Sequence, residues 1–172
     1  SAGATITTTT ATSTATGADT LVSIENFIGS QGGDTFTLNG GANAIDGRGG
    51  DDTISAGGGA DFLMGGAGND TLVGGTGNDA ILGGANNDTI NYAFGDGADA
   101  VDGGADTDTL AIIGTGGANV LDVAFSGASL TAFEGGTIVN VEAVSANLLT
   151  GTDTLSYAGS AAGVTVNLAT GI

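Results

Sequence analysis

Residues 65–73 read GGAGNDTLV, residues 74–82 read GGTGNDAIL and residues 83–91 read GGANNDTIN. Each stretch begins with two glycines, carries Asp at its sixth position and an apolar residue at its eighth. One apolar residue between small or polar neighbours predicts a strand of about three residues whose central side chain points inward. The glycines at positions one, two and four predict turns, because glycine accepts positive φ and close approach of another backbone. The chain is therefore expected to alternate strand and turn in units of nine residues.

The nine-residue frame extends over residues 29–111, with only Tyr92 and Ala93 outside it. Two units form one flattened coil of 18 residues, whose inward side chains stack in two ladders spaced about 4.8 Å apart. A single coil buries almost nothing, so stability has to come from neighbouring coils. Position eight is apolar in every unit: Phe36, Ile45, Ile54, Leu63, Leu72, Ile81, Ile90, Val101 and Leu110. The sequence thus predicts an all-β protein, a parallel β-roll of the β-helix or solenoid class, with irregular β-solenoid coils on either side.

Three segments are expected along the chain. Residues 1–28 are a Thr-rich β lead-in and connector, because β-branched residues favour extended strand. Residues 29–111 are the roll. Residues 112–172 lose the glycine frame but keep β-type runs such as TIVNVEAV, so we expect them to continue the strand stacking without the same turns and to connect to a following repeat block.

Composition and charge exclude several classes of function. Nineteen acidic residues face one basic residue, Arg48, giving a net charge of −18 that excludes binding to nucleic-acid backbones. The chain has no Cys and no His, which removes thiolate metal sites and His-dependent hydrolytic triads. The chain has no run of about 18 apolar residues, so no membrane span is predicted. We therefore expect no catalytic residues, no organic cofactor site and no enzymatic activity.

Position six is acidic in all units except that of Asn43. Alternate units return to the same edge of the roll, so the acidic side chains should form two rows. The first row is Asp34, Asp52, Asp70, Asp88 and Asp108, and the second is Asn43, Asp61, Asp79 and Asp99. Carboxylates stacked at strand spacing repel one another and require a cation. Oxygen ligands from carboxylates and glycine-rich turns suit calcium better than magnesium, zinc or copper.

The segments GGAGNDTLV and GGTGNDAIL match the pattern G-G-x-G-x-D-x-U-x, and the chain resembles the RTX (repeats-in-toxin) calcium-binding family. This resemblance implies that several calcium ions lie between turns on the same edge, held by the Asp carboxylates and turn carbonyls. Asn43 and the irregular unit FGDGADAVD depart from the pattern, and we expect weak or empty sites there. The implied metal-site residues are Asp34, Asp52, Asp61, Asp70, Asp79, Asp88, Asp99, Asp108, Gly50, Gly59, Gly68 and Gly77.

Other charged residues have simpler interpretations. Glu25 and Glu142 occur in similar connector strands, which explains them better than a pair of glycosidase carboxylates. Arg48 is interpreted as a solvated turn residue that moderates its acidic neighbours. Five aspartates away from position six are interpreted as solvated turn or strand residues: Asp46, Asp51, Asp96, Asp102 and Asp106.

The resemblance leaves two main alternatives for function. The favoured one is a calcium-binding structural module of a secreted bacterial surface protein of the surface-layer (S-layer) or adhesin type. The alternative is the folding and secretion module of an enzyme or toxin exported by type I secretion. The stretches 19–30 and 153–171 resemble connectors between repeat blocks of large secreted RTX proteins. Either alternative implies an extracellular location.

An apolar strip is expected on one outer face of the roll. Positions seven and nine should point outward, yet Phe62, Met64 and Leu82 are bulky and apolar and belong to alternate units, while Val73 lies on the opposite face. Such a strip usually marks a contact surface. It predicts either self-association with neighbouring copies or an intrachain cover formed by residues 112–172.

Overall fold

The computed structural model describes residues 6–7, 26–126, 129–158 and 167–169. These residues form strands and turns, and none of them lies in a helix that is long and apolar enough to span a membrane. The lead-in at 1–18, apart from Ile6 and Thr7, lies outside the described residues, as do Glu25 and parts of both connector stretches.

Seventeen strands build the described part of the chain. They are β1 (Ile6–Thr7), β2 (Asn26–Ile28), β3 (Thr35–Thr37), β4 (Ala44–Gly49), β5 (Thr53–Gly58), β6 (Phe62–Ala67), β7 (Thr71–Thr76), β8 (Ala80–Ala85), β9 (Thr89–Ala93), β10 (Ala100–Ala105), β11 (Thr109–Ile113), β12 (Val120–Ser126), β13 (Ser129–Phe133), β14 (Gly136–Val139), β15 (Ala143–Asn147), β16 (Thr154–Ala158) and β17 (Asn167–Ala169).

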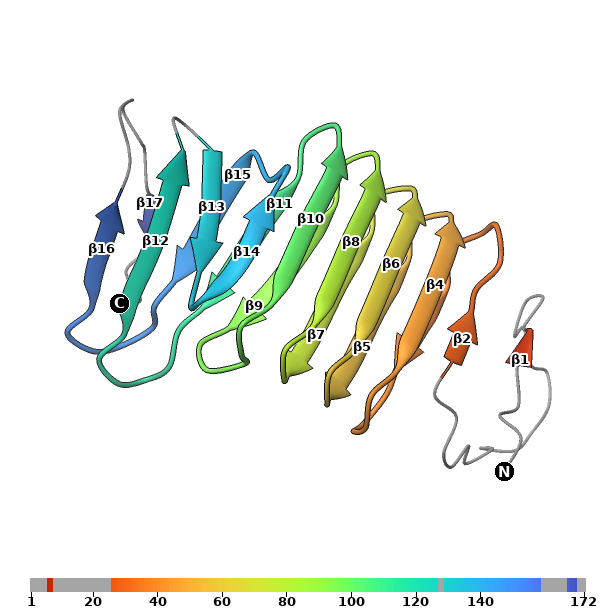
Figure 1. Ribbon diagram of the computed structural model, residues 1–172, viewed down its shortest axis with the longest axis horizontal. Coiled ribbons are helices and arrows are strands. Elements are labelled where there is room, and N and C mark those ends of the chain that lie inside the picture. Colours follow the sequence, from red (N-terminus) through yellow and green to blue (C-terminus); the bar gives the residue numbers. More distant parts are fainter. Residues whose placement is uncertain (1–5, 8–25, 127–128, 159–166, 170–172) are drawn as a thin grey trace.

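The strands form two stacked parallel sheets that face each other (Figure 1). The first sheet has the order β1-β2-β4-β6-β8-β10-β14-β13-β12-β16, and the second has the order β17-β15-β11-β9-β7-β5-β3. Through the repeats the chain alternates between the sheets, and each strand pairs with the strand two places later. Leu63 pairs with Ile81 in one sheet and Leu72 with Ile90 in the other. The predicted parallel β-roll with two ladders is confirmed.

The strands of the regular repeats are longer than expected. Strands β4 to β8 each have 6 residues rather than about three. They continue from position nine of one unit into the first positions of the next, where Gly57 pairs with Gly75 and Gly66 with Gly84. The backbone of these glycines still forms the ladder, although they present no side-chain pattern that would mark a strand.

The core consists of the position-eight side chains and of the residues at position one of the following unit. From Ile45 to Leu110 the position-eight side chains are buried. Position one is mostly glycine, so the roll is thin through the regular repeats. The filling changes after β8, where Tyr92 takes this inward place and is 4 % exposed. The insertion therefore changes the filling of the roll while the strands stay in register.

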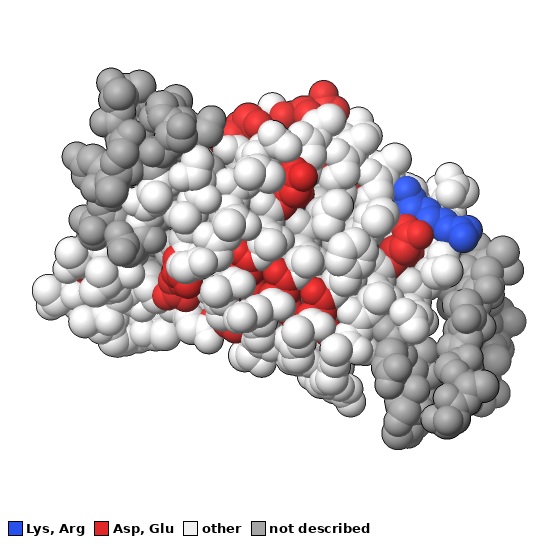
Figure 2. All heavy atoms as spheres, in the orientation of Figure 1, with Lys and Arg blue, Asp and Glu red and all other residues white. Residues whose placement is uncertain are grey.

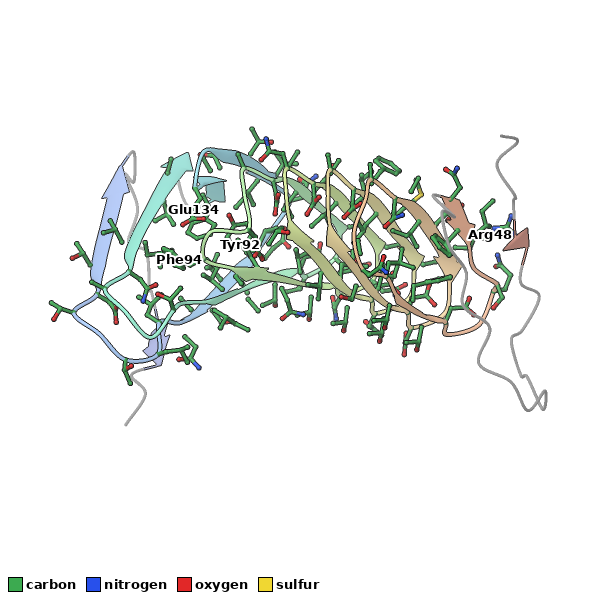
Figure 3. The ribbon with its side chains drawn as sticks, turned by 90° about the horizontal axis from the view of Figure 1, so that it is seen from below. Arg48, Tyr92, Phe94 and Glu134 are labelled. Atoms are coloured by element: carbon green, nitrogen blue, oxygen red, sulfur yellow. The ribbon has the colours of Figure 1, made fainter. Side chains whose placement is uncertain are left out.

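An aromatic cluster surrounds Tyr92 inside the roll. The rings of Tyr92 and Phe133 meet edge to face with centroids 4.8 Å apart, and Phe94 packs against Phe133 at 5.6 Å. The Tyr92 hydroxyl donates to Oε2 of Glu134 at 2.8 Å. Glu134 and Gly135 both have positive φ and form the tight turn between β13 and β14. Figure 3 shows Tyr92, Phe94 and Glu134 together beside this hairpin.

Residues after 111 continue the stack. Strand β14 adds to β10, β15 adds to β11, and β12 pairs in parallel with β16. The hairpin of β13 and β14 introduces antiparallel pairing into the first sheet. The expected continuation of strand stacking is therefore observed in the described residues.

Candidate metal centre

The first row of turn carboxylates is linked by hydrogen bonds. The amide N–H of Asp34 donates to Oδ1 of Asp52 at 2.6 Å, and that of Asp52 donates to Oδ1 of Asp70 at 2.8 Å. The same bond joins Asp70 to Asp88 and Asp88 to Asp108, each at 2.8 Å. Each side chain thus binds the backbone of the preceding coil on its own edge, as the two-row prediction requires.

The second row has the same construction on the opposite edge. The amide N–H of Asn43 donates to Oδ1 of Asp61 at 2.7 Å. The N–H of Asp61 donates to Oδ1 of Asp79, and the N–H of Asp79 donates to Oδ1 of Asp99, each at 2.9 Å. The last link spans 20 residues instead of 18, because the chain between Asp79 and Asp99 includes the two-residue insertion. The order of the row is preserved across it.

The second carboxylate oxygen of most of these side chains has no hydrogen-bond partner. Among the described residues, a buried Oδ2 without a partner occurs in Asp52, Asp61, Asp70, Asp79, Asp88 and Asp108. These side chains are at most 3 % exposed. A buried carboxylate oxygen without a donor is costly, so its repetition along both edges calls for a positively charged ligand. Asp34 differs, since its Oδ2 accepts the N–H of Ser30 at 2.6 Å.

Glycine at position one leaves the space into which these oxygens point. A Cβ on Gly65 would lie closer than 3.0 Å to both Oδ2 of Asp70 and the carbonyl oxygen of Gly83 in the next coil. A Cβ on Gly47 or Gly83 in the neighbouring coils would likewise lie close to the Oδ2 atom of the Asp five residues later and to a carbonyl oxygen of the next coil. A carboxylate oxygen and a carbonyl oxygen therefore face the same small space in coil after coil. In the second row, Ala56 holds position one beside Asp61, so this cradle is not identical in every turn.

Position four brings successive turns into close contact. Gly50, Gly59, Gly68 and Gly77 have φ of 98°, 122°, 130° and 139°, the left-handed region that favours glycine. A Cβ on Gly68 would collide with the carbonyl of Gly50, the same position of the preceding turn on that edge. The four predicted glycines therefore place their carbonyl groups in the turns. Asn86 and Asp106 take over position four with φ of 78° and 84°, a conformation that Asn and Asp tolerate better than most residues.

Burial and mutual repulsion shift the acidity of the turn carboxylates. Burial, with a smaller contribution from neighbouring carboxylates, raises the pKa of Asp52, Asp88 and Asp99 to about 6. The amide N–H bonds to Oδ1 oppose the shift. Burial also raises the pKa of Asp70 and Asp79. The folded turns thus disfavour carboxylate charge unless a cation compensates it.

The donor set fits a hard cation. Within the described residues, no three His, Cys, Asp or Glu side chains group together in a way that could hold a metal ion. The carboxylates instead succeed one another along each row, so the turn carbonyls have to supply further ligands. Six to eight oxygens, including backbone carbonyls, are what calcium prefers.

A second ladder of polar side chains, at position five, was not predicted. Oδ1 of Asp51 accepts the N–H of Asn69 at 2.8 Å, and Oδ1 of Asn69 accepts the N–H of Asn87 at 3.1 Å. Oδ1 of Asn87 then accepts the N–H of Thr107 at 2.9 Å. Asp51 is exposed as expected, but it also begins this ladder. The signal in the sequence was the return of an Asx residue at position five every 18 residues.

The hydrogen bond between a position-six side chain and the preceding coil also occurs beyond residue 111, outside the frame recognised in the sequence. The N–H of Asp108 donates to Oε2 of Glu142 at 2.9 Å, so Glu142 extends the first row. The N–H of Asn119 donates to Oδ1 of Asp153 at 2.9 Å in the same way. Residues 114–122 (GTGGANVLD) and 148–156 (LLTGTDTLS) are degenerate units. These two turns keep the position-six hydrogen bond without the glycine frame, whereas the strands β12, β13 and β14 are connected as antiparallel hairpins.

The remaining charged residues lie outside the two rows. Oδ2 of Asp96 accepts the N–H of Ala93 at 2.9 Å within the irregular turn. Oδ1 of Asp102 accepts Nδ2 of Asn140 at 2.8 Å on the outer face. Arg48 is exposed at position two with φ of 74°. Figure 2 shows acidic side chains along the edges and on the face of the roll, and Figure 3 labels Arg48 near one end of it.

Comparison with known proteins agrees with this geometry. No match was found among the curated proteins. The family model of the RTX calcium-binding nonapeptide repeat, which comprises four copies, matches residues 28–63, 64–96 and 95–110. These matches cover the turns with the linked carboxylates and partnerless Oδ2 atoms. Residues 28–110 of this chain therefore belong to the RTX family of calcium-binding nonapeptide repeats.

Proposed function

We propose that this calcium-binding structural module is part of a secreted bacterial surface protein, of the S-layer or adhesin type, and that extracellular calcium folds and rigidifies it. The observation that carries the proposal is the repeated buried Oδ2 that lacks a partner. Six such oxygens in a chain of net charge −18 make the folded roll unfavourable without bound cations.

The proposed ligands are the turn residues predicted from the sequence. Oδ1 of each position-six Asp after Asp34 accepts an N–H of the preceding coil, and in six of these side chains Oδ2 has no partner and remains available to the ion. The carbonyl groups of the position-four glycines would complete the shell together with other turn carbonyls. Bound calcium would supply the positive charge that the carboxylate rows lack. The set is Asp34, Asp52, Asp61, Asp70, Asp79, Asp88, Asp99 and Asp108, with Gly50, Gly59, Gly68 and Gly77.

Calcium should control the folding of residues 29–111. In chelator at pH 7, repulsion and the backbone entropy of glycine should leave this segment largely disordered, and millimolar calcium should order it. Far-UV circular dichroism in chelator and in calcium tests this, with magnesium as the control ion. Equal β-content in chelator and in calcium would refute the proposal.

The surface context is supported by composition and by the outer faces of the roll. Position seven of the second sheet is threonine in five successive strands: Thr35, Thr53, Thr71, Thr89 and Thr109. An acidic, glycine-rich array without histidine suits a structural role outside the cell. A calcium-poor cytosol would keep the chain unfolded for type I secretion. The sequence of the whole parent protein tests this, because many further repeats favour a surface array and a neighbouring catalytic domain favours the module of an enzyme or toxin.

We also propose that the apolar strip contacts a second copy of the chain. Phe62 is 42 % exposed, and Met64 lies beside Leu82 in the register of β6 and β8. The described strands after residue 111 extend the stack and do not cover β6 or β8, which argues against an intrachain cover (Figure 1). Changing Phe62 and Leu82 to Ser should reduce calcium-dependent association in analytical ultracentrifugation. Val73→Ser on the opposite face is the control, and unchanged association of the double variant would contradict the proposal.

A further inference from the structure

Asn119 occupies position six in a coil that lies beyond the matched repeats. It is 3 % exposed, and its N–H donates to Oδ1 of Asp153 in the same way that the turn aspartates are linked. Thr154 in turn donates its N–H to the carbonyl of Asn119 at 2.8 Å, the bond that Thr89 makes to the carbonyl of Asp70. Residues 114–122 and 148–156 are equivalent units of neighbouring coils, since β12 pairs in parallel with β16. The turn of the first unit therefore has the form of the calcium-binding repeats, with an amide where they have a carboxylate.

The amide nitrogen of Asn119 lies among four oxygen atoms. Nδ2 is 3.1 Å from the carbonyl oxygen of Thr115, 2.9 Å from that of Gly117 and 3.1 Å from that of Leu148. It is also 2.9 Å from Oδ1 of Asp153. On the other side, Oδ1 of Asn119 accepts the N–H of Thr115 at 2.9 Å and its Oγ1 hydroxyl at 3.0 Å. The reversed amide would place an oxygen among four acceptors, so these partners fix the orientation.

Oxygen atoms gathered around one electropositive atom are also what a bound cation needs, and calcium takes six to eight of them. In the regular repeats, one turn carboxylate follows another and Oδ2 of Asp70 or Asp88 is left without a donor. At Asn119 the corresponding group is neutral, and its two N–H groups are shared among three carbonyl oxygens and Oδ1 of Asp153. Neither Asn119 nor Asp153 has a buried side-chain atom without a partner. This turn therefore has no buried carboxylate oxygen that lacks a donor, unlike the turns of the regular repeats.

We propose that the amide nitrogen of Asn119 replaces a calcium ion in this coil. The coil then keeps its turn in the absence of calcium, while the regular repeats depend on the ion. A carboxylate at position 119 would turn the same ring of oxygens into a calcium site. The contrast rests on the proposed function, but the calcium independence of the Asn119 turn can be measured separately.

The test is amide hydrogen exchange by NMR on the whole chain, in chelator and in calcium. The wild type should protect the amides of Thr115, Asn119 and Thr154 in both conditions. Asn119→Asp has nearly the same shape, but it removes the two donors and adds a charge beside Asp153. In chelator its exchange at these amides should be about 10- to 100-fold faster, and calcium should restore protection. Calorimetric titration should show one more bound calcium ion per chain than in the wild type.

The matched control is Asn147→Asp in the neighbouring strand β15. It adds the same charge at an exposed side chain and keeps an oxygen to accept the N–H of Leu149. It should change neither the protection in chelator nor the number of bound ions. The inference is overturned if the wild-type amides are protected only in calcium, or if Asn119→Asp is protected in chelator like the control. It is also overturned if calcium fails to restore the variant's turn. Failure of the regular repeats to bind calcium would instead contradict the proposed function.

Discussion

Asp88→Asn should stabilise the calcium-free roll and weaken its response to calcium. Asp88 is 1 % exposed, and burial, with repulsion from Asp70 and Asp108, raises its pKa from 3.8 to about 6. A shift of about two units corresponds to about 3 kcal/mol. Because the folded-state pKa is raised, the group favours folding fully below pH 3.8, and this contribution is lost as pH rises through about 6. At pH 7 the folded chain therefore carries the full cost, which a neutral amide removes.

The side chain of Asn at position 88 keeps one native contact and loses the proposed ion contact. Its Oδ1 can still accept the N–H of Asp70, now at 2.8 Å, while the oxygen without a partner becomes a donor that faces the carbonyl of Gly103. Folding of the calcium-free chain can be driven by trimethylamine N-oxide at pH 7 in chelator and followed by circular dichroism. Asp88→Asn should fold at lower osmolyte concentration, with a gain of up to about 3 kcal/mol. In a calcium titration it should need more calcium than the wild type.

Asp46→Asn is the matched control, because it removes the same charge from position nine of a repeat unit, in strand β4 and outside both rows. It separates the relief of overall charge from the relief of a buried carboxylate. The reasoning is refuted if the two variants gain equal stability in chelator, or if Asp88→Asn responds to calcium as strongly as the wild type.

Three further predictions concern the turns. In chelator, the circular dichroism signal of β-structure should be larger at pH 4 than at pH 7 and should fall between about pH 4 and 6. The reason is that the raised pKa values of the buried turn aspartates favour the protonated folded state. A β-signal that rises over this pH range in chelator would contradict the prediction. Gly68→Ala should lower the free energy of unfolding in calcium by about 1–3 kcal/mol or more, since its Cβ would collide with the carbonyl of Gly50. Gly40→Ala is the control, because its Cβ would have its nearest neighbour 4.0 Å away. In thermal unfolding the control should differ little from the wild type. Asn69→Ala should cost about 1 kcal/mol and speed the exchange of the Asn87 amide, while unchanged exchange of that amide would show that the position-five ladder contributes little.

The repeated residues made most of the roll predictable. A regular apolar residue such as Leu72 at position eight, with Asp70 two places before it, determines which side chains point inward and which share an edge. The rows predicted from the sequence continue past the two-residue insertion to Asp99 and Asp108, and the bond between Asp79 and Asp99 confirms this for the second row. These features follow from the period alone, because every coil repeats the same geometry.

The unpredicted features depend on contacts between units with little sequence in common. Strand length was underestimated because paired glycines such as Gly57 and Gly75 show no alternation of side chains. The turn at Asn119 was missed because its partner, Asp153, comes 34 residues later, after an inserted hairpin. The aromatic cluster depends on the contact of Phe133 in that hairpin with Tyr92, a long-range contact that no local pattern encodes.

The alternation of units between two edges also sets the size of change that the molecule can tolerate. A carboxylate on one edge meets its equivalent two units later, 18 residues away in the regular repeats, and never the one in the intervening unit. Removal of residues 65–82, one complete coil, would leave every later row and ladder in register. Removal of residues 65–73 alone would exchange the edges, so that Asp79 would follow Asp52 and every later outward residue would move to the opposite sheet. An array of this kind can therefore lengthen or shorten smoothly in pairs of units, whereas the gain or loss of a single unit inverts the surface of everything beyond it.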